Sequence, residues 1–90
     1  MTTLSNNGPI DTLRDGSLKA SIWGNRNESG AWYSVDLTRG YTDEAGVWHD
    51  SRSLSNGELL RGARLLERAY DRVLELRAAD KSTASEEAQS

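Results

Sequence analysis

The chain has 90 residues, a net charge of −3 and no cysteine. Its length allows one small domain with a limited core, which favours oligomerisation, and the missing cysteines exclude disulfides and cysteine-based catalytic or metal sites and suit a reducing cytoplasm. The charge excludes a strongly basic nucleic-acid binder. Because no apolar run approaches the roughly 20 residues that cross a membrane and the start lacks a signal-peptide pattern, we expect a soluble, cytoplasmic protein without membrane contacts.

The first third of the chain predicts two strands. Residues 1–9 are polar and aperiodic, and we expect them to be disordered. Ile10 to Leu13 fits a short edge strand, and Asp15-Gly16 fits a two-residue hairpin turn. Residues 17–25 alternate between an apolar face and a face with a cation and an indole. The apolar face is Leu18, Ala20 and Ile22, and the other face is Lys19, Ser21 and Trp23.

The clearest strand pattern lies between Ala31 and Leu54. Val35 and Leu37 alternate with polar neighbours, as in a strand that is packed on one side and exposed on the other. The segment 43–46 (Asp-Glu-Ala-Gly) then interrupts the alternation. It predicts a turn, because Asp can accept hydrogen bonds from nearby backbone groups and Gly tolerates positive φ. The whole stretch is therefore predicted to form a β-hairpin.

After Leu54 the apolar spacing changes from two to 3.6, which predicts a helix. Ser55 and Glu58 fit a capping box at its start. Leu60 and Leu65 lie outside the apolar stripe of this helix, so we expect a second subunit to cover the excess apolar surface. The stripe, which Ala69, Leu74 and Leu76 broaden, consists of Leu59, Ala63, Leu66, Tyr70 and Val73.

Arginines and acidic residues share the side of the helix opposite this stripe. Two interpretations stay open: a salt-bridged face exposed to solvent, or an arginine stripe that binds phosphate. The arginines are Arg61, Arg64, Arg68 and Arg72, and the acidic residues are Glu67, Asp71 and Glu75.

The order of these elements predicts an α+β domain over residues 10–79. Three or four antiparallel strands are followed by one long C-terminal amphipathic helix (β-β-β-β-α), which lies across one face of the sheet and mediates a homodimer. Residues 80–90 are predicted to form a disordered acidic tail.

Parity along the strands places the aromatic residues. Trp23 and Trp32 are in phase with polar residues, so we expect both indoles on or near the face away from the helix. Parity leaves the side of Trp48 open. Strict alternation puts Tyr41 on the packed face, unless a bulge at Gly40 turns it over.

The sequence offers little for catalysis. Its single histidine, His49, neighbours Asp50 in a strand, so the two side chains are expected to point to opposite faces. Glycine-rich phosphate loops and metal-binding motifs are missing. We therefore expect no enzyme activity, catalytic residue, metal site, cofactor or small-molecule substrate.

A sheet face with exposed rings and nearby cations suits single-stranded nucleic acid, because bases stack on the rings and cations follow the backbone. The cations are Lys19, Arg39 and Arg52. Alternatively, the three indoles form a cross-strand cluster that only stabilises the sheet or the dimer.

The segment 36–46 (DLTRGYTDEAG) resembles the strand and turn of the transcriptional positive cofactor four family, in which an Asp-Ile-Arg strand runs through aromatics into an Asp-Pro-Glu-Gly turn. Ser53-Leu54-Ser55 is similar to that family's Ser-Leu-Asn helix entry. The resemblance covers residues 10–77 and implies a four-strand and helix protomer that dimerises through its helices and binds single-stranded DNA on curved sheets, a general fold shared with Whirly proteins. Thr38 departs from the family, which has a DNA-facing Arg there, whereas Tyr41 matches the aromatic residue on its sheet.

We therefore predict a non-enzymatic, homodimeric protein that binds single-stranded DNA, with RNA left open, in transcription regulation or in DNA replication or recombination. Trp23 and Tyr41 are the stacking candidates, and Lys19, Arg39 and Arg52 are the phosphate partners. The alternative is a protein-interaction or scaffold module of the same fold without nucleic-acid binding.

Overall fold

The computed structural model describes residues 8–89, with side chains described for residues 8–81. The disorder predicted for residues 1–9 falls mostly on residues 1–7, which lie outside the described residues.

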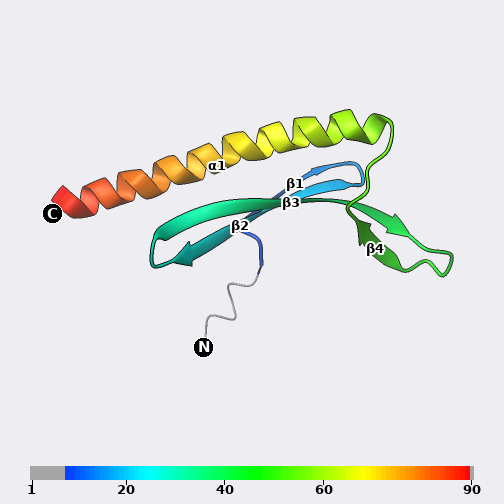
Figure 1. The fold of residues 1–90 in the computed structure, drawn as a ribbon, viewed down its shortest axis with the longest axis horizontal. Helices are drawn as coiled ribbons and strands as arrows, with labels where there is room; N and C mark the ends of the chain where they lie inside the picture. The colour runs from blue at the N-terminus through cyan, green and yellow to red at the C-terminus, as the bar shows by residue number, and fades with distance from the viewer. Residues whose placement is uncertain (1–7, 90) are drawn as a thin grey trace.

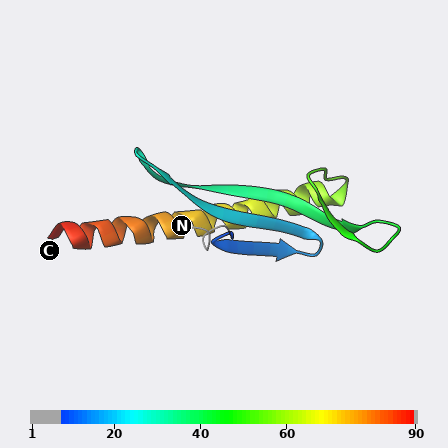
Figure 2. The ribbon, with the colours of Figure 1, turned by 90° about the horizontal axis from the view of Figure 1, so that it is seen from below.

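Four strands form one antiparallel sheet in sequence order, and one helix follows them. The elements are β1 (Asp11–Asp15), β2 (Leu18–Asn27), β3 (Gly30–Thr42), β4 (Trp48–Ser51) and α1 (Gly57–Gln89). The helix runs along one face of the sheet (Figure 1), and Figure 2, seen from below, shows the strands in front of the helix. The predicted α+β class and β-β-β-β-α order are confirmed. Within the described residues, no helix is long and apolar enough to cross a membrane.

The hairpin of β2 and β3 is the centre of the sheet. These strands pair over ten residues, from Leu18 opposite Arg39 to Asn27 opposite Gly30. β1 pairs with the first half of β2 through the two-residue loop 16–17, one residue later than predicted, because Asp15 still pairs with Leu18. Gly16 takes a φ of 61° there, the positive value that the first residue of such a loop can require.

The predicted turn at 43–46 is confirmed. The Asp43 Oδ1 atom accepts hydrogen bonds from the backbone N–H groups of Ala45 at 2.9 Å and Val47 at 3.0 Å, and Gly46 has a φ of 81°. The pairing of β3 with β4 runs without interruption from residue 39 to residue 42, so Gly40 hosts no bulge. The aromatic ring of Tyr41 therefore follows strict alternation and lies on the helix side of the sheet.

The core lies between β2 and α1. Leu18, Ala20 and Ile22 of β2 meet Leu65 and Ala69 of α1, and each is at most 1% exposed. Full burial of a large apolar side chain stabilises the fold by about 1.5–3 kcal/mol.

Gly62 allows the helix to approach the sheet closely. It is buried on the sheet-facing side of α1. A Cβ atom at this position would lie 2.9 Å from Leu54 Cδ1 and 3.2 Å from Leu37 Cδ2, closer than ordinary van der Waals contact. The missing side chain therefore sets the distance between the first turns of α1 and β3.

The predicted phase of the helix was wrong. Leu65, expected outside the packed stripe, is fully buried, whereas Leu59 and Tyr70, expected within it, are 59% and 64% exposed. Apolar residues lie on two different sides of α1. The side with the small residues Gly62 and Ala69 is the one that contacts the sheet, because small residues permit the closest approach. The sheet-facing residues are Gly62, Leu65, Ala69, Val73 and Leu76.

The helix begins and ends later than predicted. α1 starts at Gly57, and the Glu58 carboxylate accepts a hydrogen bond from the Ser55 N–H at 2.9 Å, which is one half of the predicted capping box. The backbone stays helical to Gln89, although the sequence predicted a disordered tail over residues 80–90. This segment contains no Gly or Pro and includes several good helix formers, so its sequence does not stop the helix.

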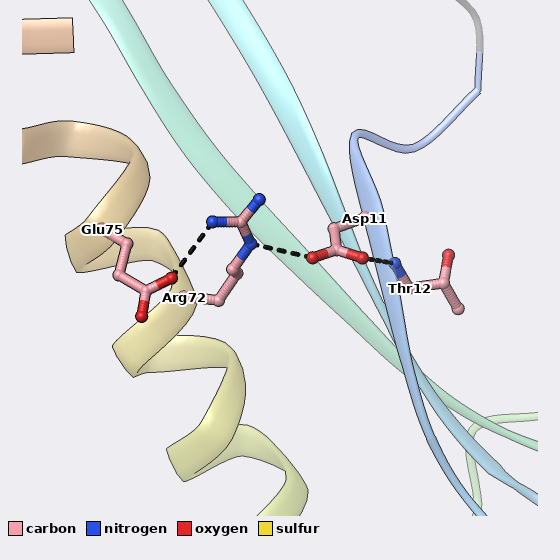
Figure 3. A network of polar contacts seen from close by, with 4 residues as sticks. All are labelled: Asp11, Thr12, Arg72 and Glu75. Carbon is pink, nitrogen blue, oxygen red and sulfur yellow. Dashed lines mark hydrogen bonds and ion pairs between the residues drawn. The ribbon is translucent and has the colours of Figure 1, made fainter. Parts of the chain in front are cut away.

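Two arginines of α1 form ion pairs with the ends of β1. Arg72 Nε lies 2.8 Å from Asp11 Oδ2 and its Nη1 lies 3.1 Å from Glu75 Oε1 (Figure 3). Arg61 Nη2 lies 2.9 Å from Asp15 Oδ1. The exposed Arg72–Glu75 pair agrees with the salt-bridged interpretation of the arginine face, and the pairs with β1 are contacts that neither interpretation included. Hydrogen bonds from Arg72 and Arg61 lower the pKa of the Asp11 and Asp15 carboxyls, respectively, below its ordinary value.

The core position of Leu65 predicts a large cost for its truncation. We expect Leu65→Ala to lower the free energy of unfolding by about 2–5 kcal/mol, because a fully buried leucine leaves a cavity. Val47→Ala is the matched control, since Val47 is 54% exposed, and should change stability by less than about 0.5 kcal/mol. Urea denaturation at one protein concentration measures both; equal effects would contradict the described core.

The ion pairs of β1 predict acid sensitivity. The pKa values of Asp11 and Asp15 are lowered in the folded protein. The two carboxylates therefore stabilise the fold at a pH above their unfolded-state pKa, and this stabilisation is lost as the pH falls through their folded-state pKa. We expect the unfolding free energy of the wild type to decrease below about pH 4 more than that of Asp11→Asn/Asp15→Asn. The difference should be small, because both pairs are exposed. Identical pH dependence in denaturation curves would contradict the prediction.

Candidate nucleic-acid interface

The face of the sheet opposite α1, here called the open face, carries all three indoles. Trp23 lies opposite Ser34 and Trp32 lies opposite Asn25, both out of phase with the buried residues of β2. This confirms the predicted side of these two rings. Trp48, whose side parity left open, lies opposite Thr42 and belongs to the same face. Among the described residues, no helix or strand covers the open face (Figure 2).

A groove of about 550 Å³ lies on the open face where β1 and β3 end and β2 and β4 begin, and is called the open-face groove below. Arg14 and Lys19 stand directly opposite each other on β1 and β2. Like charges in this position are destabilising, so they favour a bound anion. Lys19 Nζ also lies 3.8 Å from Asp50 Oδ2, a weak interaction in an exposed pair. The groove is lined by Arg14, Gly16, Ser17, Lys19, Gly40, Tyr41, Thr42, Trp48 and Asp50.

The indole of Trp48 is the most exposed large apolar group of the described residues, at 73%. Two of its ring carbons lie 3.6 and 3.7 Å from the position that a Cβ of Gly40 would occupy. The absence of a side chain at residue 40 therefore lets the ring lie across β3. This position leaves most of the ring surface available to a planar partner.

Trp23 is less available than predicted. The residue is half-buried, and its indole N–H is shielded from solvent without a hydrogen-bond partner among the described residues. Trp23 and Trp32 are diagonal neighbours across β2 and β3. Trp48 pairs eight residues further along β3 than Trp23 does, about 26 Å away at strand spacing. The three indoles therefore do not form the single cross-strand cluster that the alternative interpretation required.

Two of the predicted site residues lie on the helix side. Arg39 Nε donates to the Ser53 carbonyl at 3.2 Å and lies 3.6 Å from Glu58 Oε1, so its guanidinium holds the segment between β4 and α1. The Arg39 guanidinium carbon is 5.5 Å from the centre of the Tyr41 ring, and that ring stacks on His49 with 5.3 Å between centroids.

The predicted five-residue set is therefore divided. Lys19 and Trp23 lie on the open face, Arg39 and Tyr41 on the opposite face, and Arg52 is exposed just after β4. The prediction grouped Arg39 with Lys19, although Arg39 pairs with Leu18 and shares the face of that buried leucine. Tyr41 also lines the open-face groove, although its ring stacks on the other side.

His49 makes a local contact on the β3–β4 hairpin. Its Nε2 atom lies 2.7 Å from Asp43 Oδ2, and this hydrogen bond is the main cause of the lowered pKa of the Asp43 carboxyl. Asp50 belongs to the opposite face, in line with the expected parity. In the part of the chain that the structure describes, no group of three or more His, Asp or Glu side chains could hold a metal ion.

A second groove, of about 560 Å³, lies at the other end of the sheet, near the β2–β3 loop and the far part of α1. The Tyr33 hydroxyl donates to the Asp80 carboxylate, and this bond raises the pKa of Tyr33. Arg26 is the cation of its lining, and Asp80 is the anion. The open-face groove, with two cations and one anion, is the better site for an anionic ligand.

The sequence prediction missed Arg14 as a site residue and did not commit to Trp48. The predicted first strand ended at Leu13, so Arg14 had no strand partner. The signal was the adjacent turn: a two-residue loop at 16–17 places Arg14 opposite Lys19.

Comparisons of the chain with protein-family models, with curated proteins and with solved structures give no match. The resemblance of residues 36–46 and 53–55 to the positive cofactor four family therefore stays a prediction.

The different burial of the indoles predicts different quenching of their fluorescence. We expect Trp48→Phe to remove much of the acrylamide-accessible emission, because Trp48 is 73% exposed, whereas Trp23→Phe should remove little. Stern–Volmer slopes of the two variants provide the measurement. A larger loss of quenching in Trp23→Phe would contradict the described open face.

Proposed function

We propose that the protein binds single-stranded nucleic acid, with DNA as the expected ligand, on the open face of its sheet. The observation that supports this most is the cross-strand pair of Arg14 and Lys19, which lines the same groove as the exposed ring of Trp48. A stacking ring beside two cations is the arrangement that proteins use to bind single strands without reading their sequence.

Each part of the open-face groove suits one part of a nucleotide. A base stacks on the Trp48 ring, and the neighbouring phosphates meet Arg14 and Lys19. One such stacked base contributes about 1–3 kcal/mol. Trp32, 48% exposed at the far end of β3, provides a second ring for a strand that follows the open face.

In this proposal the predicted site residues have partly different roles from those that the sequence predicted. Lys19 keeps its role as a phosphate partner, and Trp48 replaces Trp23 as the main stacking ring because Trp23 is half-buried. Arg39 is engaged with Ser53 and Glu58 on the helix side, which makes it a structural residue in this proposal. Tyr41, which lines the groove, and Arg52, which is exposed just after β4, stay candidates. With a net charge of −3, binding should be modest and sensitive to salt.

A protein-interaction module of the same fold is the second candidate. Asp50 lies next to Lys19 at 3.8 Å and reduces the positive potential of the groove, and Asp36 adds a further negative charge to the open face. These carboxylates would favour a partner protein with its own cations over a polyphosphate. In either case the cysteine-free chain suits work in the cytoplasm.

Binding of a labelled oligo-dT, followed by fluorescence anisotropy, tests the proposal. We expect Trp48→Ala to weaken binding about 5- to 150-fold, the equivalent of one stacked base. Arg14→Ala and Lys19→Ala should each reduce the slope of log K against log salt by about 0.7, because each removes one phosphate contact. Arg68→Ala on the exposed side of α1 is the matched control and should leave both quantities unchanged.

Absence of binding near 50 mM salt would reject the nucleic-acid proposal. An equal loss of oligo-dT binding in Arg68→Ala would contradict the placement of the binding site on the open face. A purified protein partner whose binding is lost in Trp48→Ala, with no response to oligo-dT, would instead support the second candidate.

A further inference from the structure

More than half of β3 lies at the border of the sheet. β2 pairs with β3 over ten residues, whereas β4 pairs with it only from Arg39 to Thr42. After β4 the chain rises toward α1 (Figure 1), and Leu54 of this segment meets Leu37 beneath the helix. Among the described residues, no strand pairs with the outer side of residues 30–36, here called the β3 edge.

The backbone groups that point out of the β3 edge belong to its odd-numbered residues. The Gly40 N–H donates to the carbonyl of Ser17, the residue before β2, at 2.9 Å, so Gly40 faces β2. Successive residues of a strand face its two neighbours in turn, and the pairing with β2 is continuous, so the even-numbered residues face β2 as well. The N–H and C=O groups of Ala31, Tyr33 and Val35 therefore point outward.

The β3 edge lacks the features that keep exposed edges from pairing with other strands. Sheets protect such edges with lysines, prolines, bulges or short strands. Residues 30–36 read Gly-Ala-Trp-Tyr-Ser-Val-Asp, in which Asp36 is the only charged residue, and their pairing with β2 contains no bulge. An unprotected edge is the site that an extended segment uses when it adds a strand to a sheet.

An exposed apolar side of α1 lies above the β3 edge. Arg61 and Arg72 reach from α1 to β1. Leu66, Tyr70 and Leu74 are turned away from this side of the helix by about 150° at 100° per residue, and therefore lie toward β3. Each of the three is between 41% and 64% exposed. Because the helix-side residues of the β3 edge are only partly buried, a strand added there would cover apolar surface of both elements.

We propose that the β3 edge binds an extended segment of a partner protein, which adds a fifth strand to the sheet. The segment runs antiparallel to β3, as the neighbours of β3 do. Its alternate residues are apolar and lie beneath α1, against Leu66 and Tyr70, and the residues between them are polar and lie on the open face. A lysine or arginine of the segment lies opposite Asp36.

Charge favours a partner with a cation over a second copy of this chain. Asp36 is exposed at the end of the β3 edge, and Lys19 of the open face lies near Asp50 instead. Opposite charges attract across neighbouring strands, and like charges repel. A second copy that paired through the same edge would bring another Asp36 and no cation. The added strand extends the sheet and does not cover the open face, so the proposal is independent of nucleic-acid binding.

A seven-residue probe peptide, Lys-Val-Thr-Val-Thr-Val-Thr, tests the proposal with the full chain. It is acetylated at its N-terminus and carries fluorescein at its C-terminus. Antiparallel pairing places its lysine opposite Asp36 and its first two valines opposite Val35 and Tyr33. We expect saturable binding by fluorescence anisotropy. No binding at a protein concentration of about 1 mM would overturn the proposal.

N-methylation of the probe separates backbone pairing from apolar contact. In the proposed register the N–H groups of the valines face β3, and those of the threonines face away. N-methylation of the first two valines should weaken binding at least about tenfold, because it removes two hydrogen bonds. N-methylation of the first two threonines is the matched control and should change binding less than about threefold. Equal effects of the two modifications would contradict pairing through the backbone.

A charge exchange tests the role of Asp36. We expect Asp36→Lys to weaken binding of the probe at least about threefold, and a probe with glutamate in place of lysine to restore it. Asp71→Lys, exposed on another side of α1, is the matched control and should leave binding unchanged. Because both positions are exposed, circular dichroism should show an unchanged fold. A loss that the glutamate probe does not restore would exclude the pair with Asp36.

Hydrogen exchange followed by NMR identifies the occupant of the edge. The amides of Tyr33 and Val35 should exchange rapidly in the free protein and at least about tenfold more slowly with saturating probe, whereas the amide of Ser34 should be slow in both states. Slow exchange of Tyr33 and Val35 in the dilute free protein would show that the edge is already covered. Protection that rises with protein concentration without the probe would identify a second copy as the occupant. Either result would overturn the proposal.

Discussion

The packing of α1 against β2 determines which surfaces of the chain are left to bind other molecules. Leu65 and Ala69 are buried against Leu18, Ala20 and Ile22, and Gly62 brings the start of the helix close to β3. The ion pairs of Arg61 and Arg72 with the two ends of β1 are compatible with this rotation of the helix about its axis and add little to it, because both pairs are exposed. Once this rotation is set, the open face of the sheet is exposed on one side of the domain, and Leu59, Leu66 and Tyr70 of α1 are exposed on another.

The open face combines features that cost stability with features that suit an anionic ligand. Arg14 and Lys19 stand opposite each other on neighbouring strands, although like charges repel in this position. The Trp48 ring is largely exposed, although its burial would stabilise the fold. Asp50 offsets part of the positive charge. The proposed binding of a single strand, which would stack on the ring and neutralise both cations, would account for these features together.

The strands, their order and the turn at 43–46 could be predicted because alternation and turn residues are local signals. The phase of α1 could not, because Leu59, Leu65 and Leu66 give the helix apolar residues on two sides and periodicity does not say which side meets the sheet. Small residues decided it: Gly62 and Ala69 allow the closest approach. The site was predicted only in part. The side of the sheet on which Arg39 lies depends on its pairing with Leu18, and the position of Arg14 opposite Lys19 depends on a one-residue shift of the first turn.

The central claim is that single strands bind on the open face, and a titration of the ¹⁵N-labelled protein with oligo-dT, followed by NMR, tests it most directly. The three tryptophans supply three indole N–H signals. The account predicts the largest shifts for the Trp48 indole and for the backbone amides of Lys19 and Thr42, with the amides of Arg72 and Glu75 unchanged. Shifts confined to α1, or unchanged spectra at excess oligonucleotide, would contradict it.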